Sequence, residues 1–463
     1  MPSIAPVQTP APPIPATVCL LGALAVAKFT NDHTTPYEYV QYSAMVVAIG
    51  LVLSLGLELT KGIRNMTRVD LLCFASLFTL TLLEFLFPQE TFDTMATKQG
   101  TTKAVDIVLI AFAGLAIGRH FFKPMKHPPL NMPDIPPKML VQLVLLALAV
   151  ASLHMWIAVE FDPFRFWEAL MGSRWNVPWG RGKFGGWKEL LNELGLLFYV
   201  IPPAAGIAIA QRKRFKSGQL FIIVFAAFSV MFISFCGGTR HTLAAHIASF
   251  TSAFLIAGPR LTLKRLVATV GVVAPIAFLG FYHMLEFRTI GLGKYLEGIQ
   301  TPQSEFQSGI QQRETLFIDF NILNIDLLTR TIPERHDYLG WEIPFVALTK
   351  PIPRAIWKGK PEGLSVSIEE AAGVEGLTLA VTFAGEAYMA AGLPAVAIIS
   401  LLFGAFCSYW NRMAIPGNSN VGLGIFATGA LALVLSMRSL MFFTTWILPA
   451  VAMISAGVFI VKY

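Results

Sequence analysis

The fold is decided by stretches such as LFIIVFAAFSVMFISFC, residues 220–236, which contain no charged side chain. A helix needs about 20 apolar residues to cross the roughly 30 Å hydrocarbon layer of a bilayer, because every backbone polar group must be hydrogen-bonded inside the segment. Working outward from residues 220–236, similar stretches recur along the whole chain. The sequence therefore predicts an integral membrane protein built from α-helices.

The composition agrees with a membrane protein. Of the 463 residues, 55% are hydrophobic and 14% are charged, whereas soluble proteins carry about 25% charged residues. A chain this apolar cannot bury its hydrophobic surface in one water-soluble core. We expect a single all-α, polytopic domain over residues 1–463 with about 12 transmembrane helices. The predicted spans are residues 12–29, 40–59, 71–87, 105–122, 139–160, 190–210, 220–236, 241–257, 266–285, 383–410, 421–437 and 440–461.

Lysine and arginine residues gather in alternate connections between these spans. Short cytoplasmic loops of membrane proteins carry an excess of these residues, so we predict that the basic connections and both termini face the cytoplasm. Most of the net charge of +7 comes from these basic connections, which set the orientation in the membrane. We therefore expect no nucleic-acid partner. The residues concerned are Lys61, Arg64, Arg68, Lys123, Lys126, Lys138, Arg212, Lys213, Arg214, Lys216, Arg260, Lys264 and Arg265.

The cysteines and histidines do not form a disulfide or metal-binding pattern. All four cysteines fall within predicted spans, so no disulfide framework is expected. His241 and His246 are five residues apart, which places them on different faces of a helix. We therefore expect neither a bound metal nor a cofactor.

Two long connections are predicted on the outward-facing side, residues 161–189 and 286–382. They contain too many aromatic and aliphatic residues to be disordered, and ordered connections of this length are usually functional. The first holds Arg174 and Arg181 among glycines and tryptophans, which suit an interfacial helix and a close approach to phosphate. The same pattern is also compatible with a loop that only anchors lipid headgroups.

The second long connection combines a predicted amphipathic helix with concentrated cations. Residues 314–330 place leucines and phenylalanines at helical spacing, which predicts a helix that packs over the membrane face of the protein. His336 and Asp337 follow, and then the string KPIPRAIWKGKP (350–361), which contains Arg354 and Lys360. Its prolines fix the backbone around four cations. This concentration suits a diphosphate, because arginine binds phosphate oxygens bidentately.

Further ionisable residues lie where predicted spans reach the outward side. Arg240 follows a Gly-Gly-Thr turn between two spans, and it either reaches lipid phosphate or lines a site. Glu386 begins the tenth span, where a carboxylate either caps the helix or takes part in chemistry. Arg288 and Arg438 are predicted to share this side.

Together these features resemble the oligosaccharide repeat-unit polymerases, the Wzy-type O-antigen polymerases. The similarity covers roughly residues 161–437 and rests on the multispan topology with two large outer loops. It also rests on the motifs GTR (238–240), YLG (338–340), IPRAIWKGKP (352–361) and GEAY (385–388). Arg174 and Gly185 match the arginine, ten residues, glycine pattern described for outer loops of such polymerases. The second loop departs from it, because the glycine after Arg288 or Arg330 falls one residue short.

The resemblance implies a GT-C-like fold and a glycosyltransferase activity. A growing O-antigen or exopolysaccharide chain would pass from its polyprenyl diphosphate onto another lipid-linked repeat unit. The implied substrates are undecaprenyl-diphosphate-linked glycans, and the implied location is the bacterial inner membrane with the active site facing the periplasm. A chain-length regulator and a repeat-unit flippase are the implied partners, together with the lipid bilayer.

This reaction assigns expected roles to the candidate residues. Cations should stabilise the departing diphosphate, and a base should take the proton of the acceptor hydroxyl. The base stays open among Glu386, His336 and Asp337. The expected catalytic cations are Arg240, Arg288 and Arg354, with Arg174, Arg181, Lys360 and Arg438 in substrate binding, where Asp337 is also a candidate.

Two other functions remain open from the sequence. One is an O-antigen ligase of the same fold type, and the other is a polysaccharide flippase or secondary transporter. Transporters usually carry ionisable residues near mid-membrane and repeated halves with broken helices. This sequence largely lacks such features, since His246 is the one ionisable residue at the centre of the last six predicted spans. The loop motifs favour polymerisation.

Overall fold

The structure, a computed structural model, describes residues 11–89, 91–125, 129–180, 189–258, 261–298, 321–352, 356–361, 364–371, 379–414 and 419–462. These residues form helices and connections without a strand, so the predicted all-helical class is confirmed. The first half contains α1 (Ile14–Phe29), α2 (Pro36–Leu59), η1 (Ile63–Thr67), α3 (Val69–Thr81), η2 (Leu83–Leu86), α4 (Phe92–Met95), α5 (Lys98–Gly118), α6 (Pro137–Ala158), α7 (Pro163–Met171), α8 (Glu189–Leu194), η4 (Gly195–Val200), α9 (Ile201–Ala210) and η5 (Arg212–Arg214). The second half contains α10 (Ser217–Cys236), α11 (Arg240–Ala257), α12 (Leu263–Phe287), α13 (Leu292–Leu296), α15 (Asn321–Thr329), α16 (Glu342–Thr349), α17 (Ile368–Ala371), α18 (Thr382–Asn411), α19 (Asn420–Ser436), η6 (Leu440–Phe442), α20 (Phe443–Trp446) and α21 (Leu448–Lys462).

Among the described residues, eight helical segments are long and apolar enough to cross a membrane. Three shorter apolar helices, α1, α3 and α19, lie among them. Every predicted span falls on helix, but α11 is less apolar because it carries Arg240, His241 and His246. The chain is therefore a polytopic helical membrane protein, while the number of twelve crossings stays a prediction. The eight segments are Pro36–Leu59, Lys98–Gly118, Pro137–Ala158, Leu191–Ala210, Ser217–Cys236, Leu263–Met284, Thr382–Asn411 and Leu440–Lys462.

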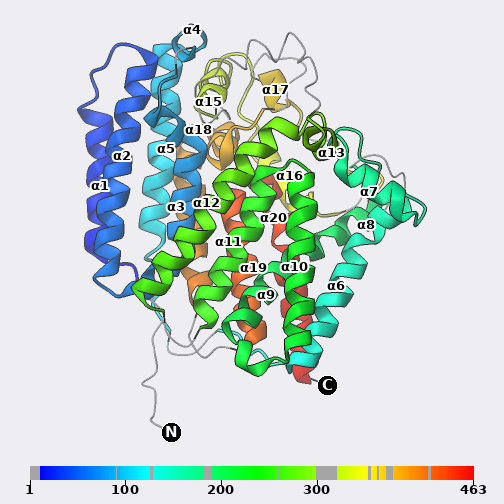
Figure 1. Cartoon of the computed structure of the whole chain (residues 1–463). Coiled ribbons are helices and arrows are strands. Elements are labelled where there is room, and N and C mark those ends of the chain that lie inside the picture. Colours follow the sequence, from blue (N-terminus) through cyan, green and yellow to red (C-terminus); the bar gives the residue numbers. More distant parts are fainter. Residues whose placement is uncertain are drawn as a thin grey trace.

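The helix bundle has two different ends (Figure 1). The short helices α4, α7, α13, α15 and α17 gather at one end, which we call the loop end. At the opposite end, the terminal end, Asn65 Nδ2 donates to the carbonyl of Ala11 just before α1 (3.2 Å). Arg214 there pairs with Asp134 (2.5 Å), whose carboxylate also accepts the amide of Asn420 (3.1 Å). Basic connections that are far apart in the sequence therefore meet at the terminal end.

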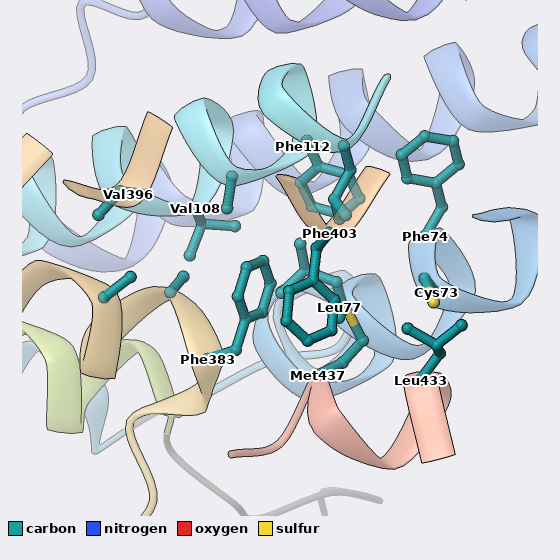
Figure 2. Close-up of a cluster of buried hydrophobic side chains, with 14 of the residues drawn as sticks. Cys73, Phe74, Leu77, Val108, Phe112, Phe383, Val396, Phe403, Leu433 and Met437 are labelled. Atoms are coloured by element: carbon teal, nitrogen blue, oxygen red, sulfur yellow. The ribbon is translucent and has the colours of Figure 1, made fainter. Parts of the chain in front are cut away.

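The centre of the core lies where α3, α5, α18 and α19 meet (Figure 2). Phe74 from α3, Phe112 from α5 and Phe383 from α18 are at most 2% exposed. Helices α5 and α18 approach closely because Gly118 has no side chain. A Cβ atom at this position would lie 2.1 Å from the carbonyl oxygen of Leu401. This contact holds the first half of the bundle against α18.

Helix α18 is interrupted near its loop end. Ala391 (φ −161°, ψ 38°) and Gly392 (φ 70°, ψ −155°) are not helical, so helical geometry stops after residue 390 and then resumes. The carbonyls freed at residues 389 and 390 accept the amides of Leu339 (2.9 Å) and Gly340 (2.8 Å). We call residues 382–390 the half-helix. Broken helices are typical of transporters, and the sequence did not predict this one. The break is stable because a distant segment, residues 339 and 340, satisfies the freed carbonyls.

Helix α15 differs from the predicted amphipathic helix. Its described residues are buried around almost the whole circumference, and they pack chiefly against α5. Asp326 is 0% exposed and is paired with Arg330, while it also accepts the amide of Thr97 (3.1 Å). The polar side of the helix can be buried because this carboxylate is neutralised. The expectation of an amphipathic helix is therefore wrong for residues 321–329, and residues 314–320 lie outside the described residues.

Candidate functional site

A cavity of ≈ 650 Å³ lies at the loop end of the bundle. Its walls come from residues 170–180 of the first long connection, from Tyr199 of η4 and from the turn between α10 and α11. The half-helix of α18 and residues 438–446 complete it. Segments separated by hundreds of residues therefore share one space. We call this space the loop-end cavity.

Arg174 reaches the loop-end cavity because the backbone after α7 packs against the backbone after α12. Its amide donates to the carbonyl of Arg288 (3.4 Å), and its Nη1 donates to the carbonyl of Gly238 (3.3 Å). Gly238 has φ 62°, and a Cβ there would lie 2.8 Å from the Cβ of Arg288. A glycine is therefore needed for this approach. The Arg174 guanidinium also lies 4.8 Å from the ring centre of Trp175, a cation–π distance.

Three arginines from separate segments interact at this point. The pKa of Arg174 is lowered from its usual value, first because the side chain is partly buried and then because Arg288 and Arg438 are positively charged. Arg438 Nη1 lies 3.5 Å from Nδ1 of His241, which also lines the cavity. A positive potential therefore accumulates here, and it favours the entry of an anion.

Glu386 is the single carboxylate among the described residues that line the cavity. It belongs to the half-helix and is 2% exposed. Its Oε1 accepts the hydroxyl of Ser439 (2.6 Å), and its Oε2 accepts the amide of Met441 (3.1 Å). The amide of Phe383 donates to the carbonyl of Met437 (3.1 Å), so the start of the half-helix is tied to the same segment. These bonds satisfy the buried carboxylate and fix its orientation.

Aromatic side chains form much of the remaining wall. Trp179, Tyr199, Phe442 and Trp446 all line the cavity, and the rings of Phe442 and Trp446 stack at 5.5 Å. The ammonium of Lys350 lies 4.6 Å from the ring centre of Phe442. Aromatic walls with a few placed polar groups are typical of sites for small organic ligands.

The cavity brings together some of the residues that the sequence suggested. Arg174, Glu386 and Arg438 line it directly. Arg288 lies beside Arg174, as their backbone hydrogen bond shows. Arg240 is the first residue of α11 and stands between two lining residues, without lining the cavity itself.

Other candidate residues lie elsewhere. His336 and Asp337 belong to the connection between α15 and α16 and do not line the cavity, so Glu386 alone of the three candidate bases reaches it. The ammonium of Lys360 donates to the carbonyls of Lys350 (2.9 Å) and Ile352 (2.8 Å), and it thereby closes its own loop. Arg181 and Arg354 lie outside the described residues.

Several cavity residues were not predicted. His241 was considered only as a metal ligand, although its position directly after Arg240 was a usable signal. Lys350, the first cation of the proline-rich string, does not line the cavity itself but lies against Phe442 in its wall. Tyr199 and Trp446 had no signal of their own, because an aromatic residue in an apolar stretch resembles ordinary membrane packing.

Comparison with protein-family models, with curated proteins and with solved structures finds no match. In the part of the chain that the structure describes, no group of three or more His, Cys, Asp or Glu side chains is placed to hold a metal ion. The function is therefore inferred from the loop-end cavity and from the resemblance in the sequence.

Proposed function

We propose that the protein joins polyprenyl-diphosphate-linked oligosaccharide repeat units into O-antigen or exopolysaccharide, at the outer face of the bacterial inner membrane. One observation carries the proposal: Arg174, Arg438 and His241, from three segments, surround the same cavity as Glu386. Glycosyl transfer from a diphosphate needs cations around the leaving group and a base beside the acceptor. The cavity holds both kinds of group.

The cations would act on the leaving group. An acceptor hydroxyl of one lipid-linked unit attacks the anomeric carbon of the growing chain, and the bond from this carbon to the diphosphate oxygen breaks. The polyprenyl diphosphate departs with the additional negative charge. Arg174 and Arg438 stabilise this charge by bidentate hydrogen bonds to phosphate oxygens, and the partly buried setting strengthens the attraction. Arg288 adds positive charge from behind Arg174.

Glu386 would accept the proton of the attacking hydroxyl. The bonds from Ser439 and Met441 hold its two oxygens in place, and each oxygen keeps a further lone pair. Because the side chain is 2% exposed, bulk water competes little for these positions. The aromatic walls leave room for sugar rings beside it.

The proposal includes a topology. The loop end faces the periplasm, and both termini face the cytoplasm, because the basic connections gather at the terminal end. Twelve crossings in a GT-C-like arrangement are part of the proposal. A chain-length regulator and a repeat-unit flippase would work beside the protein in the same membrane.

Deletion of the gene, followed by gel analysis of the surface glycan, tests the proposal. We expect the ladder of long chains to collapse to single repeat units. An intact lipid-linked polymer that is not attached to its acceptor would instead indicate an O-antigen ligase. A complete loss of surface units would indicate a flippase.

The flippase or secondary transporter is the second candidate, and the break in α18 favours it. A half-helix with a buried carboxylate next to a cavity is the kind of feature that transporters use to bind a substrate. Proteoliposomes separate the two activities. A polymerase lengthens lipid-linked units presented on the cavity side, whereas a flippase changes the leaflet of the units and leaves their length unchanged.

A further inference from the structure

A second hollow, of different chemistry, lies deeper in the bundle. It has a volume of ≈ 320 Å³ and lies between α6, η4, α9, α19 and α21. Among its described lining residues Asn420 has the single polar side chain, and both ends of that amide bond the backbone of Ile135 (2.7 and 3.0 Å). The remaining wall is aliphatic. We call this hollow the apolar groove.

The apolar groove occupies the half of the bundle nearer the terminal end. Along α21 it extends from Pro449 to Ile460, which corresponds to about 17 Å at 1.5 Å per helical residue. Asn420 is the first residue of α19, at the terminal end. The span that contains α21 begins at Leu440, next to the residues Met441 and Phe442 that line the loop-end cavity, so the groove starts near mid-span.

The apolar groove is in line with the loop-end cavity. On η4, Tyr199 lines the cavity, whereas Leu197 and Val200 line the groove. On the opposite wall Trp446 lines the cavity, and Pro449, three residues later, lines the groove. On each wall the residues that line the two spaces are therefore at most three positions apart.

The apolar groove is open toward the lipid. Leu143 and Leu146 of α6 line it while they are 37% and 59% exposed. Ala452 and Ala456 of α21 also line it and are exposed. Small side chains on α21 thus leave a channel into which a flexible chain can enter sideways.

We propose that the apolar groove holds the distal part of the polyprenyl chain whose diphosphate binds at the loop-end cavity. This inference rests on the proposed function and adds a subsite for the lipid carrier. A phospholipid acyl chain spans only about half of the ~30 Å hydrocarbon layer. A chain anchored at the loop end therefore fills the groove only if it is longer than one leaflet. The groove selects long carriers by apolar contact along its length.

Tryptophan substitutions that fill the groove test this inference. Ala452→Trp and Ala456→Trp each place a large side chain in the groove from an exposed position. Val451→Trp is the matched control, because Val451 is 46% exposed on the same helix and does not line the groove. Affinities of the purified full-length protein are measured for undecaprenyl diphosphate and for farnesyl diphosphate, a chain too short to fill the groove.

The wild-type protein and the control are expected to bind undecaprenyl diphosphate at least about tenfold more tightly than farnesyl diphosphate, a difference of about 1.4 kcal/mol. The two groove variants should lose this preference and keep the affinity for farnesyl diphosphate. A preference retained in both folded groove variants overturns the inference, and so does a wild type without preference. If neither diphosphate binds the wild type, the proposed function itself fails. The groove variants could instead lose a phospholipid that co-purifies with the wild type and still prefer undecaprenyl diphosphate. That result would identify the groove as a phospholipid site and overturn the inference.

Discussion

Each end of the bundle brings arginines and carboxylates into one region, but the two arrangements differ in burial, in charge balance and in space. At the terminal end Arg119 pairs with Glu58 (2.8 Å), and Arg68 pairs with Asp70 (2.9 Å). All four side chains are at most 2% exposed, and Asn411 donates a further bond to Asp70 (2.7 Å). The hollow next to Arg68 measures ≈ 10 Å³. We call these four residues the terminal-end cluster.

The loop-end cavity has the opposite properties. Arg174, Arg438 and His241 line it, whereas Glu386 is the one described carboxylate in its wall and is bonded by neutral groups. Its volume of ≈ 650 Å³ leaves room for an organic ligand. A buried cluster with balanced charges and no space is structural, because each charge already has its partner. A cluster with excess positive charge beside an open space is stabilised most by binding an anionic ligand. The loop-end cavity is therefore the better candidate for the functional site.

The largest expected effect is on stability and comes from breaking the terminal-end cluster. Arg119→Leu leaves Glu58 buried without its partner, which should lower the free energy of unfolding by about 3–5 kcal/mol. Thermal or denaturant unfolding of the purified protein measures this. The double variant with Glu58→Leu should recover much of the loss. A single variant as stable as the wild type would contradict the structural role of the cluster.

A loss of rate is expected when the carboxylate of the cavity loses its basicity. Glu386→Gln keeps the size of the side chain and its bonded position but cannot take a proton. The rate of chain extension should fall about a thousand-fold, or roughly 4 kcal/mol in the barrier. Binding of undecaprenyl diphosphate and the unfolding temperature should change little, and both are measured on the same preparation. Unchanged extension would remove Glu386 as the base.

A smaller loss of rate is expected from Arg438→Ala. Removing one cation that stabilises the leaving group should slow extension about a hundred-fold, with a change in stability below about 1 kcal/mol. Arg335→Ala is the matched control, because Arg335 is exposed in the connection between α15 and α16 and does not line the cavity. Extension is read from the glycan ladder and from rates in proteoliposomes. Equal effects of both variants would mean that the cavity has no special role.

The smallest expected effect tests the half-helix. Gly392→Ala introduces a Cβ 2.9 Å from the hydroxyl of Tyr338, in a conformation with φ 70°. The cost should be about 1–3 kcal/mol in unfolding free energy, with slower extension because the half-helix carries Glu386. Gly56→Ala is the control, since a Cβ there meets nothing within 4 Å. A Gly392→Ala protein with normal stability and rate would show that the break does not position Glu386.

The fold could be predicted in its class but not in its details. Apolar length and the absence of charge identify the helices, because these are properties of each segment alone. The break in α18 was missed, since its carbonyls are satisfied by Leu339 and Gly340, some fifty residues earlier in the chain. The burial of α15 was missed because nothing in the sequence shows that Asp326 would be buried and paired with Arg330.

The site could be predicted as a collection of residues but not as an arrangement. Arg174, Arg438 and Glu386 were candidates on chemical grounds, and all three line the cavity. His336 and Asp337 had equally suitable chemistry but lie outside the cavity. Sequence chemistry could not separate these two groups, because the difference depends on which connection packs against which helix end.

Residue composition and charge pattern alone were enough to establish a helical membrane protein whose basic connections share one side. This is so because the bilayer acts on each segment separately, through its length, its apolarity and its flanking charges. The meeting of Arg174 with Arg288, and of Glu386 with Ser439, could be known only from the packed chain. These contacts depend on glycines that permit close backbone approach and on side chains that replace water for buried polar groups, and both are properties of the assembled bundle.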